Sequence, residues 1–366
     1  MRITSRKSAL SGLAALGVVA LFAGCAPAPE EGGDTKAPVV SDFLPCMVSD
    51  AGGFDDKSFN QLGYEGLVKA ADELGVKEKH VESATATDFK PNLTSLVDQG
   101  CNLIITVGFA LAEATAESAK ANPDIEYVSI DDTIDLDFDG KTDVPNVKPI
   151  VFDTAQAAFL AGYLSAGVSK TGKVGTYGGM QFPTVTIFMD GFAQGVAHYN
   201  TEKGKKVAVV GWDTATQKGV FSGTFNAGTQ PLTDAQNLID QGVDVLLPVG
   251  GPIYQSAAAA IRDSGKEIAL LGVDADVFVT DPSVADLLLT SIRKGIDVGV
   301  EEAVLAAGKD EFDVTPFVGT LENEGVGLAE FHDWADRVPA ELQDELDKLK
   351  ADIISGDVKV TSYLAK

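Results

Sequence analysis

Short apolar runs alternate with helical patterns along most of the chain. Strand-like runs in the first half occupy residues 43–49, 80–83, 103–107 and 127–130. The apolar spacing between them predicts helices over residues 59–74, 92–99 and 110–120. Further strand-like runs follow at residues 173–177, 206–210, 243–249 and 268–273. This alternation predicts an α/β fold with parallel sheets that are covered by helices on both faces.

Two segments from different halves of the chain share one pattern. Residues 96–108, LVDQGCNLIITVG, align without a gap on residues 238–250, LIDQGVDVLLPVG, at an offset of 142. Glycine ends helices readily, so chance or convergent loop chemistry could produce a short match. A register held over thirteen residues favours two lobes of similar fold.

The same offset aligns Asp132 with Asp274, and each of them follows an apolar run. Ligands bind beyond the carboxyl ends of strands in open parallel sheets, so two facing lobes would aim both carboxylates into one cleft. The alternative is that each aspartate caps the following turn or helix. The spacing alone leaves both interpretations open.

Glycine pairs followed by aromatic residues form a looser parallel between the halves. Residues 52–53 precede Phe59, and residues 178–179 precede Phe188. An aromatic residue near the start of a helix usually belongs to the core. One ring from each lobe could equally stack on a flat ligand, and each such stack contributes about 1–3 kcal/mol.

The first residues resemble a secretory signal that ends in a lipid attachment site. Three basic residues precede the uncharged stretch 8–24, which is too short to span a bilayer comfortably, and residues 21–25, LFAGC, resemble the bacterial lipobox. Cys25 would then be acylated, as in a palmitate-bearing lipoprotein, which places the protein on the extracytoplasmic face of the cell membrane. A plain secreted protein cut at the same place is the alternative.

A division of the chain follows from these patterns. We expect a signal peptide over 1–24, a lipidated Cys25 and flexible linker over 25–37, an N-terminal lobe over 38–152 plus about 277–312, and a C-terminal lobe over 153–276 plus about 313–366.

The chain is strongly acidic, with a formal net charge of −26. Without the signal, 25 basic and 54 acidic residues remain, so clustered Lys and Arg for nucleic-acid binding are not indicated. Only Cys46 and Cys101 follow Cys25, and without a CxxC pair two buried thiols are the default. A Cys46–Cys101 bridge outside the cell stays an open alternative.

Catalytic and metal motifs give little positive signal. The three histidines lack metal-ligand spacing, no nucleophile elbow or Walker loop occurs, and neither a cofactor nor a catalytic residue is expected. Asp135, Asp137 and Asp139 match the start of a calcium loop, but its twelfth position is Asn146 instead of the usual Glu. We interpret this segment as an acidic surface loop, with weak calcium binding as the alternative.

One motif is highly specific. Residues 49–60, SDAGGFDDKSFN, resemble the opening motif of the basic membrane protein (Bmp/Med) family, which comprises nucleoside-binding lipoproteins related to purine nucleoside receptor A. The resemblance covers nearly the whole mature chain and continues through residues 108–109, 122–124, 159–163, 191–192, 272–276, 290–294, 325–328 and 354–360.

The resemblance implies a type I periplasmic-binding-protein fold. Two αβα lobes with parallel sheets would be crossed by three connections, and a nucleoside would lie in the cleft between them. Phe59 and Phe188 would stack on the base from both sides, and Gly250 and Gly251 would bring backbone close to the ligand. A flat base gains from two faces of π surface.

The resemblance also assigns polar roles. Asp50, Asn60 and the Asp131–Asp132 pair would hydrogen-bond the base or its surroundings, since carboxylates accept bonds from amines and hydroxyls. Asp274 and Lys294 would hold the ribose hydroxyls, and a buried lysine beside carboxylates avoids an unpaired charge. For Lys294 the alternative is a solvated helix residue, because residues 291–300 look amphipathic.

We therefore expect a monomeric, non-enzymatic receptor that captures a purine nucleoside of the adenosine, guanosine or inosine class. It would close by hinge motion and dock an ABC-transporter permease. Three alternatives remain: the same fold with a sugar or other small polar metabolite, a surface interaction lipoprotein without a transport role, and, third, a nucleoside hydrolase.

Overall fold

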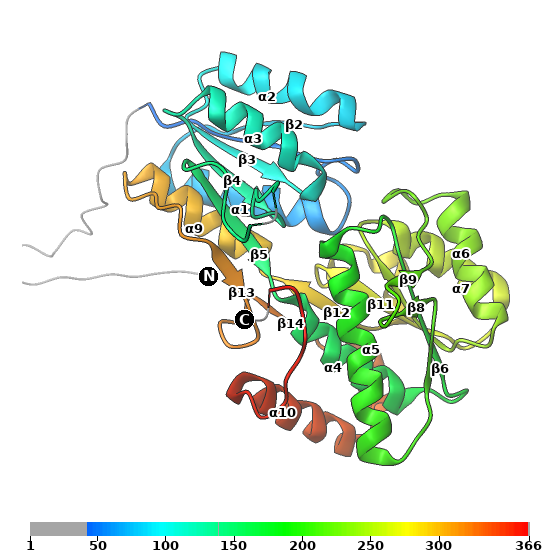
Figure 1. Cartoon of the computed structure of the whole chain (residues 1–366). Coiled ribbons are helices and arrows are strands. Elements are labelled where there is room, and N and C mark those ends of the chain that lie inside the picture. Colours follow the sequence, from blue (N-terminus) through cyan, green and yellow to red (C-terminus); the bar gives the residue numbers. More distant parts are fainter. Residues whose placement is uncertain (1–41, 138, 365–366) are drawn as a thin grey trace, which may run out of the picture. The chain divides into compact units, whose positions relative to one another are not determined.

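Two six-stranded sheets organise the molecule, seen in the computed structural model of Figure 1, which describes residues 42–137 and 139–364. Both sheets belong to one compact unit of the chain. The signal peptide, Cys25 lipidation and linker expected over residues 1–37 lie outside the described residues.

The first sheet has the strand order β13-β5-β4-β3-β1-β2, and every neighbouring pair is parallel. Its strands are β1 (Pro45–Val48), β2 (Lys79–Val81), β3 (Leu103–Val107), β4 (Glu126–Ile130), β5 (Val147–Phe152) and β13 (Phe317–Gly319). Its helices are α1 (Phe59–Leu74), α2 (Phe89–Asp98), α3 (Ala112–Ala121) and α9 (Ile296–Gly308), with short turns η1 (Ala86–Asp88) and η2 (Phe109–Leu111).

Alternate residues of these strands point to opposite faces of the sheet, as strand geometry requires. Met47 and Ile105 pack in one core cluster with Leu67 of α1. Their neighbours Cys46 and Ile104 pack in another cluster that contains residues of α2 and α3. Figure 1 shows α2 and α3 on one face of this sheet, and α1 and α9 on the other. The lobe is therefore a three-layer αβα sandwich.

The second sheet has the order β14-β12-β11-β10-β6-β7, in which only the β12–β14 pair is antiparallel. Its strands are β6 (Lys173–Gly178), β7 (Ala208–Val210), β10 (Val245–Val249), β11 (Ala269–Asp274), β12 (Leu288–Lys294) and β14 (Val326–Leu328). The associated helices are α4 (Thr154–Val168), α5 (Pro183–Lys203), α6 (Thr229–Asp240), α7 (Ile253–Ser264), α8 (Val277–Thr280) and α10 (Ala340–Ser355). The short pieces are β8 (Trp212–Asp213), β9 (Lys218–Gly219), η3 (Pro282–Leu287) and η4 (His332–Arg337).

The two sheets match strand for strand. The aligned segments of the sequence repeat end in β3 and β10, which occupy corresponding places in the two strand orders. The chain passes from one sheet to the other three times, after β5, after β12 and after β13. The predicted type I periplasmic-binding-protein architecture is confirmed.

Sheet membership differs from the sequence-based division in the last third of the chain. That division gave about 277–312 to the N-terminal lobe, but α8, η3 and β12 belong with the second sheet, and the crossing comes at Gly295. It also gave about 313–366 to the C-terminal lobe, whereas β13 pairs with β5 of the first sheet. β13 is three residues long, and periodicity does not detect so short a strand.

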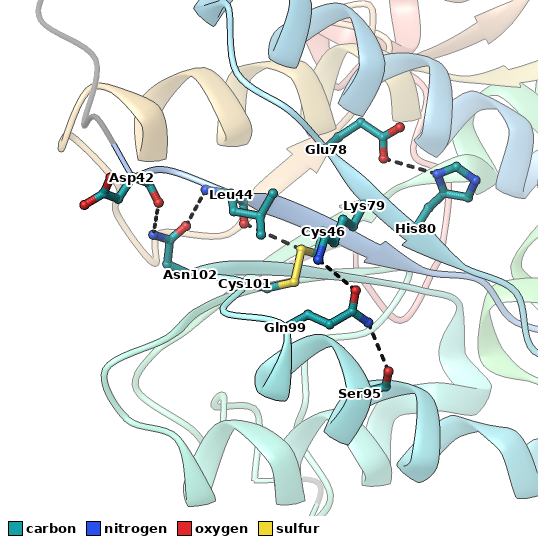
Figure 2. Close-up of a disulfide and its surroundings, with 10 residues drawn as sticks. All are labelled: Asp42, Leu44, Cys46, Glu78, Lys79, His80, Ser95, Gln99, Cys101 and Asn102. Atoms are coloured by element: carbon teal, nitrogen blue, oxygen red, sulfur yellow. Dashed lines mark hydrogen bonds and ion pairs between the residues drawn. A yellow bond between two sulfur atoms is a disulfide. The ribbon is translucent and has the colours of Figure 1, made fainter.

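Cys46 and Cys101 form a disulfide bond (Figure 2). The bond joins β1 to the turn before β3, with 5.9 Å between the two Cα atoms. Both cysteines are buried. Cys46 pairs in register with Lys79 of β2, whose ammonium group donates a hydrogen bond to the side-chain oxygen of Gln99. The default expectation of two buried thiols is therefore wrong.

Candidate ligand-binding site

A cavity lies where strand ends of both sheets converge. Nine of the ten expected ligand-binding residues line it: Asp50, Phe59, Asn60, Asp131, Phe188, Gly250, Gly251, Asp274 and Lys294. Eleven further lining residues had no role predicted from the sequence, and Asp56, Phe109, Phe182 and Phe225 are among them.

The motif at residues 49–60 folds into a connected set of polar groups at the start of α1. The Asp56 carboxylate accepts hydrogen bonds from the backbone N–H groups of Ser58 and Asn60, each at 2.9 Å, and so caps the helix. The side-chain amide of Asn60 donates to Asp56 Oδ2 at 3.0 Å and to Asp50 Oδ1 at 2.8 Å. Asn60 thereby fixes the Asp50 carboxylate at the cavity wall.

Asp50 and Asn60 both line the cavity and retain hydrogen-bonding capacity. Burial raises the pKa of Asp50 to about 7, against the opposing effect of the hydrogen bond from Asn60. Asn60 is 2 % exposed, and its Oδ1 has no hydrogen-bond partner among the described residues. A buried acceptor without a partner is costly, so this oxygen is ready to accept a donor from a ligand. Near neutral pH the Asp50 carboxyl group can therefore accept a hydrogen bond when it is ionised, or donate one when it is protonated.

Lys294 supplies a positive charge to the lining. Its Nζ pairs with Asp131 of the first lobe and lies 3.5 Å from Asp274 Oδ1 of the second. The ring centroids of Phe188 and Phe59 lie 5.0 Å and 5.2 Å from the same nitrogen. Burial alone would lower the pKa of Lys294, but the two carboxylates outweigh it and raise that pKa, so the lysine stays charged.

The alternative interpretation of Lys294 as a solvated helix residue is wrong. Strand β12 extends to Lys294, only 4 % of the residue is exposed, and α9 begins at Ile296. The apparent amphipathic pattern of residues 291–300 combines the end of a strand with the first turn of a helix.

Asp131 and Asp274 occupy equivalent places in the two lobes. Asp131 directly follows β4, Asp274 ends β11, and both have left-handed backbone angles, with φ of 62° and 67°. Non-glycine residues rarely adopt this conformation, and it occurs often at functional sites. Burial raises the pKa of both aspartates, that of Asp274 to about 6, although Lys294 opposes the shift.

Asp132, which the repeat aligns with Asp274, does not line the cavity. Its Oδ1 accepts a hydrogen bond from the backbone N–H of Ile134, as the turn-capping alternative supposed. The residue that lies opposite Asp274 is Asp131, so the structural equivalence is shifted by one from the offset of 142. We infer that the connection between the paired strands differs by one residue in the two lobes.

Aromatic rings from both lobes form the apolar wall. Phe188 lies inside α5, not at its start, and is only 2 % exposed, so most of its ring is covered. Phe59, Phe109, Phe182 and Phe225 are partly exposed at the cavity. Phe59 therefore offers a ring face from the first lobe, and Phe225 offers one from the second.

Gly250 and Gly251 form the turn after β10. Their φ angles are 122° and 52°, which L-residues with side chains rarely adopt. A Cβ atom on Gly250 would lie 2.6 Å from the Phe225 ring, and one on Gly251 would lie 3.3 Å from the Phe225 carbonyl oxygen. The glycine pair thus makes room for Phe225, a residue on an irregular loop without a periodic signal.

The acidic loop has the form of a surface turn. Side-chain oxygens of Asp135, Asp137 and Asp139 come within 4.8 Å of one another, but Asp135 and Asp137 already accept backbone N–H bonds within the loop. The side chain of Asn146 donates to three backbone carbonyls outside it. Self-contained hydrogen bonding of this kind is typical of aspartate-rich turns.

The fold and the cavity define a two-lobed solute-binding protein. The sequence model of a family of ABC transporter substrate-binding proteins, described as PnrA-like (Bmp), matches residues 43–362. The chain belongs to this family, and its resemblance to basic membrane proteins is confirmed. It is a substrate-binding protein of the ABC transporter class and not an enzyme.

Similar proteins cover the chain almost completely. The ABC transporter nucleoside-binding protein BmpA of Lactococcus lactis subsp. cremoris is 30% identical over 95% of this chain and 97% of its own. Basic membrane protein A of Borreliella burgdorferi is 28% identical over 85% of this chain and 86% of its own. The crystal structure of an ABC transporter solute-binding protein from Aeropyrum pernix K1 has a TM-score of 0.77 and 23% identity, covering 88% of this chain and 94% of that one. Within the described part, no helix combines the length and apolarity needed to span a membrane.

Proposed function

We propose that this protein captures a purine nucleoside in the cavity between its lobes and delivers it to the permease of an ABC importer. The observation that carries the proposal is the combination of chemistry in the cavity lining. Asp50 and Asn60 supply hydrogen-bonding groups, phenylalanine rings supply apolar faces, and the ion-paired Lys294 supplies a positive charge beside carboxylates. A nucleoside presents a polar base edge, a flat base and a hydroxylated sugar.

In this proposal the base edge hydrogen-bonds Asp50 and Asn60. The Asn60 Oδ1 without a partner would accept an N–H from the base, and Asp50 would accept or donate depending on its protonation. The base would stack on Phe59, with Phe225 as the facing ring in place of the covered Phe188.

The sugar would lie beside Lys294. Its hydroxyls would donate to Asp274 and Asp131 and accept from the ammonium, so every buried charge keeps a partner when the ligand binds. The Lactococcus relative BmpA is named as a nucleoside-binding protein, which supports this ligand class. Asp132 does not line the cavity and has no ligand contact in this proposal.

Calorimetry with adenosine, guanosine, inosine and ribose tests the proposal. We expect binding by at least one nucleoside and at least tenfold weaker binding by ribose, because ribose lacks the base that stacks. Tighter binding by ribose would favour the sugar-binding alternative, a class represented on this fold by the arabinose-binding protein AraP, at 14% identity and a TM-score of 0.58. If no small ligand raises the melting temperature, the surface-lipoprotein alternative gains support.

We further propose that the mature protein is a monomer anchored through acylated Cys25 on the extracytoplasmic face of the cell membrane. The lipobox-like residues 21–25 support this part of the proposal. We expect Cys25→Ser to abolish incorporation of a palmitate analogue and to release the protein from membranes. Retention of the label in the variant would contradict lipidation at Cys25.

A further inference from the structure

One pair of phenylalanine rings joins the lobes at the cavity. Phe109 begins η2 in the first lobe, Phe182 precedes α5 in the second, and their ring centroids lie 5.0 Å apart at an interplanar angle of 35°. Among the ring–ring contacts of the described residues, this is the one that links the two lobes. The Phe182 ring also contacts Phe225, at 5.9 Å, so an aromatic wall continues into the second lobe.

The backbone conformation is restricted at or next to both phenylalanines. Pro183 restricts Phe182 to an extended conformation, and the Phe182 carbonyl accepts the N–H groups of two residues in the first turn of α5. On the other side, Gly108 turns the chain with φ of 105° immediately before Phe109. Both rings therefore extend from well-anchored element ends.

The pair lies beside the residues assigned to the base. A Cβ atom on Gly108 would lie 2.7 Å from Asp50 Oδ2 and 3.4 Å from the Phe59 ring. The residue that follows this glycine, Phe109, is thus next to the groups proposed to recognise the base.

Phe182 also lines a second groove on the surface, so one ring borders both the groove and the cavity. Other groove residues include Gln181, Pro183, Ile187, Asp190, Gln217 and Tyr363. We therefore expect removal of the Phe182 ring to connect the two spaces.

From this arrangement we propose that Phe109 and Phe182 form a gate beside the groups assigned to the base, which controls ligand release and limits the size of base substituents. The phenyl rings carry no hydrogen-bonding group, so their role differs from that of Asp50 and Asn60. Their contact must break when the lobes separate. The inference rests on the proposed nucleoside function for its ligand and on the interlobe ring contact for its mechanism.

Stopped-flow release of the fluorescent nucleoside 2-aminopurine riboside tests the gate in the full chain. An aromatic pair contributes about 0.5–1.5 kcal/mol, so Phe109→Ala and Phe182→Ala should each speed dissociation about 2- to 12-fold. The double variant should be no faster than the faster single variant, because both changes remove one contact. Phe317→Ala is the matched control, since Phe317 makes a ring contact in the first lobe but does not line the cavity.

A substituted ligand tests the size limit. N6-benzyladenosine should bind the wild-type chain at least tenfold more weakly than adenosine does, and Phe182→Ala should remove most of this difference by opening the groove. Phe182→Leu should restore part of it. An unchanged ratio of the two affinities in Phe182→Ala would overturn the size limit.

Solution X-ray scattering of the ligand-free chain gives a readout that needs no nucleoside. Loss of the interlobe contact should increase the radius of gyration of Phe182→Ala relative to Phe317→Ala. If the wild type binds no nucleoside while Phe182→Ala still expands, the proposed function fails and the gate stands. Equal radii, together with equal release rates of any nucleoside that binds, would overturn the gate.

Discussion

Replacement of Lys294 by methionine should destabilise the protein and abolish nucleoside binding together. Methionine fills a similar volume but carries no charge, so Asp131 and Asp274 would lose the cation that compensates them. Both carboxylates are buried, at 6 % and 4 % exposed. Removing one partner of a buried ion pair costs about 3–5 kcal/mol, because it leaves an uncompensated charge in the interior.

The sign of the pH dependence follows from the same two carboxylates. Burial already raises the pKa of Asp274 to about 6 in the wild type, and the loss of Lys294 removes the main opposing influence. A carboxyl group whose pKa is raised in the folded state binds protons more tightly there than in the unfolded chain. The free energy of unfolding of Lys294→Met should therefore fall as pH rises from about 4 toward 8, more steeply than in the wild type.

Urea unfolding at pH 5 and pH 8, with and without nucleoside, measures these effects. Lys148→Met is the control, since Lys148 pairs at 3.4 Å with a largely exposed Asp313 and should lose about 1 kcal/mol or less. Adding Asp131→Asn and Asp274→Asn to Lys294→Met should recover stability without recovering nucleoside affinity. Equal stability of the two lysine variants with wild-type nucleoside affinity would refute the reasoning.

Four further perturbations have defined outcomes. Phe59→Ala should weaken nucleoside binding by about 1–3 kcal/mol in calorimetry, and unchanged affinity would exclude Phe59 as a stacking face. Burial raises the pKa of Asp50 to about 7, so the folded chain binds this proton more tightly than the unfolded chain does. Ionisation of Asp50 therefore lowers the free energy of unfolding as pH rises from about 4 to 7. Asp50→Asn should flatten that slope in urea titrations, and a slope equal to the wild type would contradict the burial argument. The disulfide closes a loop with a sequence separation of 55, so joint replacement of Cys46 and Cys101 by alanine should cost about 4 kcal/mol. A loss below about 1 kcal/mol in urea unfolding would show that the bridge constrains the unfolded chain little. Adenosine 5′-monophosphate should bind at least tenfold more weakly than adenosine, because the charged residues of the lining are four aspartates and one lysine that is already paired, and comparable affinities would argue against that electrostatic account.

The repeat in the sequence was sufficient to predict the two lobes, because identical residues at a constant offset mark equivalent elements. It was not sufficient to select the cavity aspartate. The offset of 142 pointed to Asp132, but a difference of one residue between equivalent segments places Asp131 at the cavity. Periodicity detects buried faces and does not register single-residue changes in a connection.

The cavity-lining aromatic residues were missed in the sequence for a different reason. Phe225 lies on a loop between β9 and α6, and Phe182 lies just before a helix, so neither belongs to an amphipathic pattern. Phe188 does belong to a helix and was selected, yet the fold covers it almost completely. Loop residues that carry function are recognisable only when the elements around them are placed in space.

The charges of the cavity explain how binding and lobe closure can be linked. Lys294 and Asp274 both belong to the second sheet and stay together in any arrangement of the lobes, whereas Asp131 follows a strand of the first sheet. We propose that hinge closure of the lobes brings the Lys294–Asp131 pair together and buries it. The net benefit of a buried pair depends on additional hydrogen bonds to its members. Ligand hydroxyls beside Lys294 would supply those bonds, so the closed arrangement is favoured most when the cavity is occupied.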